Sequence, residues 1–196
     1  PDGVGFQEGA YLACGATTAY QALKKLNVSG RDVIAVFGQG PVGLAATMFG
    51  SHMGARVIAV DINKDRLDWA ELAGAWMTVD NSDGNAVEQI YELTNGDGAD
   101  ASLEAVGGQS ITRVAALDSL RPFGRGCFVG EGGDVTFSPS DQIIHKQITL
   151  IGSWTFSTIG LSEAANFVAN KNIPIGKLVS NAVSIEDAPA ALQAFS

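Results

Sequence analysis

The chain alternates between short apolar runs and longer runs in which apolar residues recur at helical spacing. Residues 33–37 read Val-Ile-Ala-Val-Phe, a continuous apolar run that predicts a strand buried on both faces. Further apolar runs predict strands near residues 56–60, 76–79, 100–105, 126–130 and 148–151. Between them, helical patterns predict helices near residues 41–53, 64–74, 84–94, 108–121 and 139–146. Strands that alternate with helices over short connections pair in parallel through right-handed crossovers.

This alternation predicts an α/β fold: a doubly wound, six-stranded parallel sheet of the Rossmann type, three layers (α/β/α) thick, with strand order 3-2-1-4-5-6. Residues 1–30 precede the pattern and predict two short helices, Phe6–Leu12 and Thr17–Leu26, with Gly15 between them. The end of the chain has a different pattern. It predicts a helix over 161–170, a break at 173–176, an extended segment over 178–185 and the start of a helix over 186–195.

A glycine-rich turn, residues 38–43 (GQGPVG), joins the first predicted strand to its helix. Gly38 permits a tight turn, and a Cβ at Gly40 would keep a pyrophosphate away from the backbone. Gly43 allows the helix to pack closely on the strand. Pro41 lacks an N–H near a helix start, where the free N–H groups and the helix dipole attract phosphate. With a strand before it and a helix after it, the turn predicts a dinucleotide-binding site.

Asp61 ends the second predicted strand, eighteen residues after Gly43. A carboxylate at that place can accept hydrogen bonds from a ribose diol. It favours NAD over NADP, because its negative charge repels the 2′-phosphate of NADP. Arg66 would favour NADP if its guanidinium reached that phosphate, but it lies one helical turn further on and is expected to face solvent. The expected cofactor is therefore NAD.

Composition and charge exclude several classes of partner. The chain has 12 Lys and Arg against 21 Asp and Glu, a formal net charge of −9, and its basic residues form no run. Nucleic acid and anionic membrane surfaces would need a basic patch, so neither is an expected partner. No apolar stretch approaches the roughly twenty residues that span a bilayer, and no secretory signal is recognisable. The 46% hydrophobic residues and 24 glycines suit a packed core with many tight turns.

The chain contains two cysteines, Cys14 and Cys127. Two cysteines make no disulfide framework, which favours a reducing, cytoplasmic environment. Cys127 lies within a predicted strand and is expected to be a packed core residue. His52 and His145 have no partner at metal-binding spacing, so neither is expected to be a ligand.

Three parts of the chain together resemble the medium-chain dehydrogenase/reductase superfamily, of the zinc-dependent alcohol and polyol dehydrogenase type. They are Ala13–Tyr20 (ACGATTAY), Val36–Leu67 around the glycine turn, and Gly98–Gly107 with its continuation Leu120–Arg125. The similarity covers essentially the whole chain, including Lys146–Ser153. It is specific at the level of the superfamily and does not extend to a substrate.

The resemblance implies a two-domain enzyme whose catalytic domain comes from the N-terminal half and the C-terminal end of the polypeptide. Residues 16–153 would form the dinucleotide-binding domain, residues 1–15 a lead-in from the catalytic domain and residues 154–196 a partial return into it. The chain starts at Pro1 rather than Met and ends at Ser196 within a helical pattern. We therefore expect a fragment that lacks the N-terminal catalytic half and is inactive on its own.

By the same resemblance, Cys14 corresponds to a protein ligand of the catalytic zinc. A thiolate suits that role, because it binds Zn²⁺ at roughly 2.3 Å while a fourth position stays open for a substrate oxygen. A single cysteine among apolar residues also has a simpler interpretation, a buried structural thiol. One thiolate does not hold zinc tightly, so the zinc site in this chain is expected to be incomplete.

The nicotinamide end is expected at the carboxyl ends of the later strands, where ligands bind in this fold. Related enzymes hold the carboxamide there, and the resemblance places Thr18 near the nicotinamide and Lys64 at the adenine ribose. Glu131 and Trp154 could equally be ordinary loop residues. The residues expected to bind the cofactor are Thr18, Gly38, Gly40, Pro41, Val42, Gly43, Asp61, Lys64, Val106, Gly107, Val129, Gly130, Gly152 and Ser153.

The resemblance implies hydride transfer from a secondary alcohol or polyol, a small-molecule substrate, to NAD. It also implies a homo-oligomer, a dimer or tetramer, because many relatives pair edge strands at the stretch Gly152–Phe156. Two alternatives stay open. One is a zinc-free relative of the quinone-reductase type, which generally lacks a cysteine at the place of Cys14. The other is a stand-alone NAD-binding module without catalysis.

Overall fold

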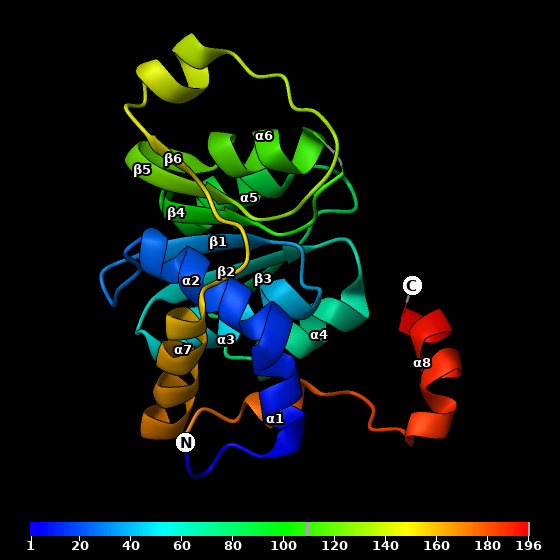
Figure 1. Cartoon of the computed structure of the whole chain (residues 1–196). Coiled ribbons are helices and arrows are strands. Elements are labelled where there is room, and N and C mark those ends of the chain that lie inside the picture. Colours follow the sequence, from blue (N-terminus) through cyan, green and yellow to red (C-terminus); the bar gives the residue numbers. More distant parts are fainter. Residues whose placement is uncertain (109, 196) are drawn as a thin grey trace.

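The computed structural model describes residues 1–108 and 110–195. Its centre is a six-stranded sheet in the order β3-β2-β1-β4-β5-β6, and every pairing is parallel. The strands are β1 (Val33–Phe37), β2 (Arg56–Asp61), β3 (Met77–Asp80), β4 (Ala99–Glu104), β5 (Leu120–Phe128) and β6 (Thr149–Gly152). The predicted doubly wound strand order is confirmed (Figure 1).

Strand β1 lies in the interior of the sheet, and its sequence suits that place because all five side chains are apolar and buried. Side chains along a strand alternate between the two faces. Ile34 and Val36 pack into the core on one face, whereas Val33, Ala35 and Phe37 pack into a second core on the other face. The apolar run therefore supplies both cores at once.

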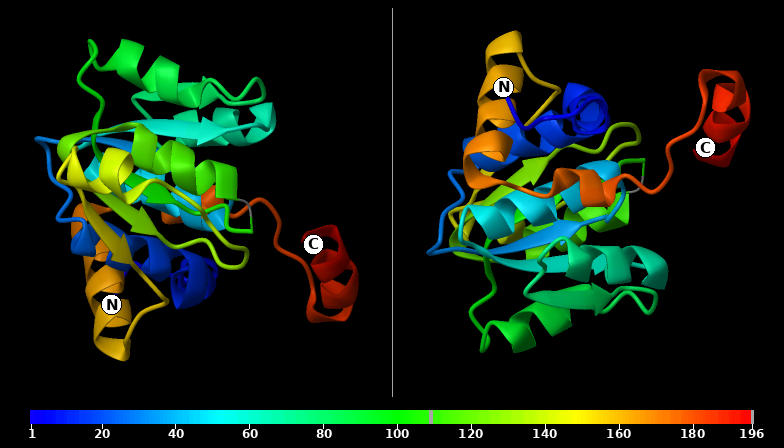
Figure 2. Two further views of the ribbon diagram at one scale, coloured as in Figure 1. Left: turned by 90° about the horizontal axis from the view of Figure 1, so that it is seen from above. Right: turned by 90° about the horizontal axis from the view of Figure 1, so that it is seen from below.

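Helices cover both faces of the sheet, which gives the predicted three layers (Figure 2). On the face of Ile34 and Val36 lie α2 (Thr17–Lys25), α3 (Pro41–His52) and α7 (Thr158–Lys171). On the opposite face lie α5 (Ala86–Leu93) and α6 (Ser110–Asp118). Helix α4 (Lys64–Leu72) connects β2 to β3 and packs against both strands.

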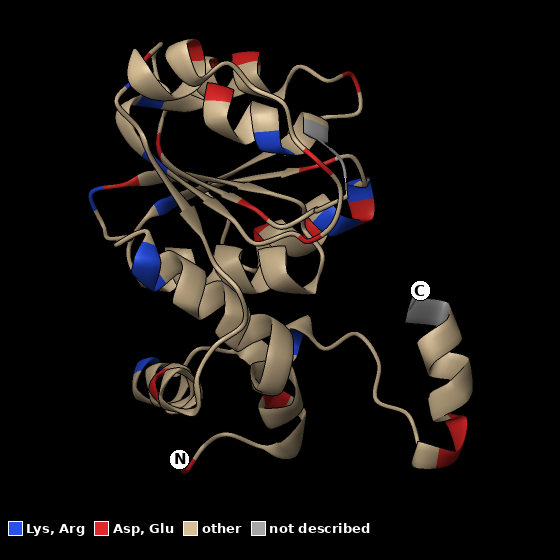
Figure 3. Ribbon diagram, turned by 45° about the horizontal axis from the view of Figure 1, so that its top comes forward, with Lys and Arg blue, Asp and Glu red and all other residues tan. Residues whose placement is uncertain are grey.

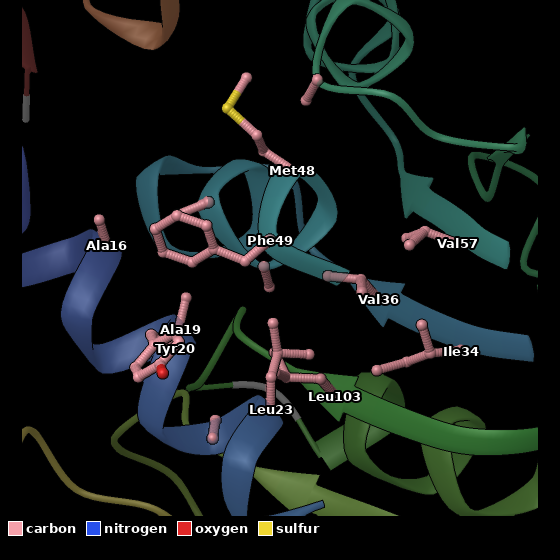
Figure 4. Packing of buried hydrophobic residues seen from close by; sticks show 14 of the residues in the cluster. Ala16, Ala19, Tyr20, Leu23, Ile34, Val36, Met48, Phe49, Val57 and Leu103 are labelled. Atoms are coloured by element: carbon pink, nitrogen blue, oxygen red, sulfur yellow. The ribbon is translucent and has the colours of Figure 1, made fainter. Parts of the chain in front are cut away.

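Three aromatic rings join α2, α3 and α7, and two of them, Tyr20 and Phe49, are seen in Figure 4. The ring centroid of Phe49 lies 5.9 Å from that of Tyr20 and 5.8 Å from that of Phe167, and the Tyr20 and Phe167 centroids are 5.4 Å apart. Such a pair contributes about 0.5–1.5 kcal/mol beyond its buried area. Phe49 belongs to α3, so this cluster holds the helix that follows the glycine turn in a fixed position.

The N-terminal segment forms one continuous helical run, so the prediction of two helices separated at Gly15 is wrong. Helix α1 (Phe6–Tyr11) leads into a π-helical turn, η1 (Leu12–Ala16), which continues directly into α2. Gly15 lies inside this turn, where an added Cβ would be 3.3 Å from the Tyr11 ring. A small residue is needed there for close packing, and the wider π turn keeps the helix unbroken.

The helix predicted over residues 108–121 ends at Asp118, and β5 begins at Leu120 instead of near residue 126. Lys146 explains the early end, because its ammonium donates to the carbonyl oxygens of Asp118 at 2.7 Å and Leu120 at 2.9 Å. Phe123, at a φ of 62°, bends the first part of β5. The rest of the strand pairs with β4 and β6 as predicted.

The elements after β5 are short. The helix predicted over 139–146 is a π-helical turn, η2 (Pro139–Ile144), and α7 is longer than the predicted 161–170. Two 3-10 turns follow, η3 (Ile175–Leu178) and η4 (Ile185–Asp187), and residues 179–184 between them are not a strand. Helix α8 (Ala188–Phe195) stands apart from the sheet and its helices (Figures 1 and 2).

Candidate functional site

The turn after β1 brings the backbone of residues 38–43 to the carboxyl edge of the sheet. Gly38 has a φ of +87°, and a Cβ on it would lie 2.7 Å from Cγ2 of Val106. A Cβ on Gly43 would overlap the carbonyl oxygen of Gly38. Gly40 differs, because apart from its neighbours along the chain no described atom lies within 4 Å of the place where its Cβ would be. The fold itself requires Gly38 and Gly43, whereas the space over Gly40 is open.

The first turn of α3 faces the same edge. Pro41 begins the helix, Gly40 is its N-cap, and no side chain in the described part of the chain caps the helix N-terminus. Tyr11 adds a second anchor, because its hydroxyl donates a hydrogen bond to the carbonyl oxygen of Pro41. Free N–H groups and the positive end of the helix dipole together favour a phosphate at this place.

Gln39 fastens the glycine turn from inside the protein. Its side chain is fully buried, donates to the carbonyl oxygen of Val36 at 2.9 Å and accepts from Oγ1 of Thr47 at 2.9 Å. Its backbone N–H donates to Oδ2 of Asp61 at 2.5 Å. No pattern in the sequence predicted this role of Gln39, although a buried amide between a strand and an apolar helix implies that partners exist.

The carboxylate of Asp61 is held in place before any ligand arrives. It is 7% exposed at the end of β2, and its Oδ1 accepts from the N–H groups of Ile62 at 2.8 Å and Asn63 at 2.9 Å. With the bond from Gln39, three backbone donors orient it. Two carboxylate oxygens offer about four acceptor positions, so one is left for a further donor.

Arg66 both faces solvent, as predicted, and approaches Asp61. Its side chain is 56% exposed, and its Nη1 lies 4.0 Å from Oδ2 of Asp61. Asn63 caps α4 by accepting from the N–H of Arg66 at 3.2 Å, which fixes the start of that helix beside the carboxylate. Lys64 is exposed at the first position of α4. Both basic residues therefore lie on the helix that follows Asp61.

The predicted nicotinamide residues lie at the ends of three neighbouring strands, β4, β5 and β6. Val106 is half-exposed next to Gly38, and Gly107 lies directly against Gly130, where a Cβ on either would overlap the other's loop. Ser153 is 5% exposed, and its N–H donates to the carbonyl oxygen of Phe128 at 3.0 Å. The structure thus joins the loops after β4 and β5 closely, and Ser153 follows one strand further on.

A buried ion pair lies beneath these loops, and the sequence analysis did not identify it. Glu104, at the end of β4, is fully buried, and Arg113, on α6, is 6% exposed. Nε of Arg113 lies 3.8 Å from Oε2 of Glu104. The available signal was a glutamate at the end of a strand expected in the interior of the sheet, since buried carboxylates are usually paired.

Cys14 lies in the π turn η1 and is exposed, so the interpretation as a buried thiol is wrong. The neighbouring Gly15 packs close to Pro41, which places this turn beside the start of α3. The hydroxyl of Thr18, which was predicted to lie near the nicotinamide, donates to the carbonyl oxygen of Cys14 at 2.9 Å, so its hydrogen atom is already in use within the helix. Among the described residues, no group of three or more His, Cys, Asp or Glu could hold a metal ion.

The remaining cysteine and the histidines have structural surroundings. Cys127 is buried in β5, as predicted, and burial raises the pKa of its thiol to about 11. Nδ1 of His52 lies 2.8 Å from the carbonyl oxygen of Met48 within α3. Nδ1 of His145 lies 3.5 Å from Oδ1 of Asp141 on the surface. Lys and Arg are spread over several elements with Asp and Glu among them (Figure 3).

Comparison with known proteins agrees with the fold and with the position of the candidate site. Residues 41–170, which include the end of the glycine turn, Asp61 and the loops after β4 and β5, match the family model described as zinc-binding dehydrogenase. The chain belongs to this family. Membership in the zinc-binding dehydrogenases confirms the resemblance found in the sequence.

Curated relatives within this group include the uncharacterized zinc-type alcohol dehydrogenase-like protein YphC of Escherichia coli, 34% identical over 96% of this chain. D-xylulose reductase A of Aspergillus oryzae is 32% identical over 97% of it. Among solved structures, the alcohol dehydrogenase TADH from Thermus sp. ATN1 superposes with a TM-score of 0.88 at 28% identity, over the full chain.

The chain spans about half the length of the relatives it matches: 53% of YphC, 54% of the xylulose reductase and 56% of the Thermus enzyme. The predicted domain boundaries at residues 15 and 153 stay predictions. In the described part of the chain, none of the helices has the length and apolar character needed to cross a bilayer.

Proposed function

We propose that this zinc-binding dehydrogenase chain binds NAD, with the pyrophosphate over residues 38–43 and the adenosine ribose on Asp61. The observation that carries this proposal is the open space over Gly40 beside a carboxylate that backbone donors already orient. A fixed acceptor loses little entropy when a ribose hydroxyl donates to it. The residues present therefore fit the cofactor.

The bound cofactor would accept a hydride from a carbon atom of the substrate. The chain's own residues would do the positioning. Asp61 would accept a hydrogen bond from the ribose diol at its remaining acceptor position, and the N-terminus of α3 would face the negative pyrophosphate. The loops at Val106–Gly107 and Val129–Gly130 would receive the nicotinamide end, since ligands in this fold bind beyond the carboxyl ends of the strands.

We further propose that the chain is the cofactor half of an enzyme that oxidises a secondary alcohol or polyol. Family membership supports this reaction, and so do relatives named as a xylulose reductase and an alcohol dehydrogenase. Because the chain covers about half of those proteins, residues that bind the substrate and take up its hydroxyl proton are expected outside it.

The described residues do not form a zinc site by themselves. Cys14 can offer one thiolate, and a catalytic zinc site takes three protein ligands. Two more ligands would have to come from elsewhere in a longer protein. This same observation favours a second candidate function for the chain alone, a module that binds NAD without catalysis.

Titration with NADH and NADPH tests the cofactor proposal. We expect the unmodified chain to bind NADH more tightly. The substitution Asp61→Asn keeps the side-chain shape and removes its charge, so NADH affinity should fall about tenfold and NADPH affinity should rise. The rise in NADPH affinity should vanish in the double variant Asp61→Asn/Arg66→Met. Arg66 lies beside position 61 and is the cation that would attract the 2′-phosphate.

Tighter binding of NADPH than of NADH by the unmodified chain would contradict the proposal. Alcohol oxidation in the presence of NAD and zinc separates the two candidate functions. Turnover by this chain alone would exclude the non-catalytic module, whereas NADH binding without turnover supports a cofactor half that lacks its catalytic partner.

A further inference from the structure

Two loops at the carboxyl edge of the sheet form a single unit, which we call the paired loops (residues 105–108 and 130–133). The N–H of Gly108 donates to the carbonyl oxygens of Glu131 at 2.8 Å and Gly132 at 3.2 Å. A Cβ on Gly107, Gly130 or Gly133 would overlap the backbone of the opposite loop. The two loops therefore meet backbone to backbone, and side chains elsewhere must hold their shape.

Arg113 holds the second of the paired loops. Its guanidinium reaches from α6, donates through Nη1 to the carbonyl oxygen of Gly133 at 3.1 Å, and donates through Nη2 to those of Gly130 at 2.9 Å and Gly132 at 2.6 Å. The planar fork of an arginine suits three acceptors, whereas the single ammonium of a lysine does not match their geometry. Three carbonyl groups thus converge on one buried cation.

Glu104 holds the first of the paired loops by accepting hydrogen bonds from its backbone N–H groups, whereas Arg113 donates to the carbonyl groups of the second. Its Oε1 accepts from the N–H groups of Val106 at 3.0 Å and Gly107 at 2.9 Å, and from Oγ1 of Thr112 at 3.0 Å. Its Oε2 makes no hydrogen bond within the described structure and faces Nε of Arg113 at 3.8 Å. Burying such a pair has a large desolvation cost, so stability alone is a weak reason for its presence.

The place of the paired loops connects them to the cofactor. Val106 contacts Gly38, so the first loop borders the glycine turn directly. Strand order β2-β1-β4-β5 places Asp61, the glycine turn and the paired loops in sequence along one edge. A dinucleotide that starts at Asp61 and crosses the glycine turn would reach the paired loops with its nicotinamide half.

We propose that Arg113 is a positioning residue of the cofactor site: by binding three carbonyl groups of the second loop, it gives the paired loops the shape that receives the nicotinamide half. The adenosine half does not depend on it. This inference rests on the proposed NAD binding and adds to it which buried residue determines the affinity for the nicotinamide half.

Calorimetric titration of the chain with NADH and with ADP-ribose, which lacks the nicotinamide, tests the proposal. The variant Arg113→Lys keeps the buried charge and loses the fork. We expect its NADH affinity to fall about tenfold and its ADP-ribose affinity to stay within about twofold of the unmodified chain. Amide hydrogen exchange should also become faster in residues 130–133.

Arg125→Lys is the control, because Arg125 is an ion-paired arginine too, less buried than Arg113, and lies in β5 beside Asp32. It should leave both affinities unchanged. Unchanged NADH binding in Arg113→Lys would overturn the inference alone. Equal loss of NADH and ADP-ribose would overturn it as well, because Arg113 would then support the whole fold. Failure of the unmodified chain to bind NADH would remove the proposed function and this inference together.

Discussion

Gly40 and Gly43 lie three residues apart in the same turn, yet an added methyl group would meet different surroundings at each. At Gly43 it would overlap the backbone of Gly38, and at Gly40 it would enter open space. The packing of the fold does not require a glycine at position 40, and we attribute the glycine there to the proposed approach of a pyrophosphate from solvent. At the scale of single residues, this contrast separates a folding requirement from a binding requirement.

The contrast predicts opposite results for two alanine substitutions. Gly43→Ala should destabilise the chain by about 1–3 kcal/mol or more, because the helix must move away from the strand. Gly40→Ala should change the unfolding free energy by less than about 0.5 kcal/mol and weaken NADH binding at least tenfold. Urea unfolding and NADH titration measure the two quantities. Normal NADH affinity in Gly40→Ala would mean that the cofactor does not cross this turn.

The residues that the sequence indicated are those with local signals. The glycine spacing and Asp61 could be identified because strand, turn and helix follow one another within 30 residues. Gln39, Glu104 and Arg113 could not, because their roles depend on partners that only the fold brings near. Arg113, for example, binds the carbonyl group of Gly133 twenty positions later in the chain. Single buried polar residues of this kind do not recur at helical or strand spacing, so a periodic pattern in the sequence does not reveal them.

Among elements, the amino ends of β1, β4 and β5 are joined by ion pairs. Arg125 donates to Oδ1 of Asp32 at 2.7 Å, and Arg121 donates through Nε to Oδ1 of Asp100 at 2.5 Å. Burial by itself would raise the pKa of Asp32, but hydrogen bonds from Arg125 and Ser29 outweigh it, so the pKa is lowered. We propose that the cofactor binds at the carboxyl edge of the sheet, whereas ion pairs join the strands at the opposite end.

The lowered pKa predicts how acid affects stability. In the unfolded chain Asp32 titrates near its ordinary value of about 3.9, above its folded value. The contribution of Asp32 to the unfolding free energy is therefore complete at pH values above its unfolded pKa, and it is lost as the pH falls toward its folded pKa. Asp32→Asn should flatten the fall in unfolding free energy between about pH 5 and 3. Urea unfolding at several pH values measures this, and the exposed control Asp83→Asn should leave the slope as it is.

Element types and their order were predictable, and element ends were less so. The strand order 3-2-1-4-5-6 follows from alternation and handedness alone. The end of α6 does not, because Lys146, 28 positions after Asp118, takes over the carbonyl group that ends the helix. Strand β6 is the last strand of the sheet, and its pairing with a second copy stays a prediction.

At the scale of the molecule, the last segment contributes little to the folded body. Most residues of the range 180–193 are exposed, and α8 packs chiefly against η4. Ending the chain after Val179 should therefore change the unfolding free energy by less than about 0.5 kcal/mol and leave NADH affinity unchanged. The contrast is Ile175, which is fully buried. Ile175→Ala should cost about 2–5 kcal/mol in the same urea measurement.

A large loss of stability on this truncation would contradict the prediction, because it would show that the removed segment packs against the rest of the chain. The relatives are about twice as long as this chain. The part that we propose to bind the cofactor is built on a sheet whose strand order was predictable from the sequence, as was the glycine turn, whereas the contacts between the loops after β4 and β5 were not.

The π turn η1 has a consequence for how the family's sequences should be aligned. A π turn carries one residue more than the α-helical turn it replaces, and it is equivalent to a single-residue insertion in a helix. Because the extra residue is absorbed within the turn, deleting Gly15 should give a regular helix in which α1 keeps nearly the same orientation relative to α2. One gap, placed one position too early or too late, decides which residue is matched to Cys14.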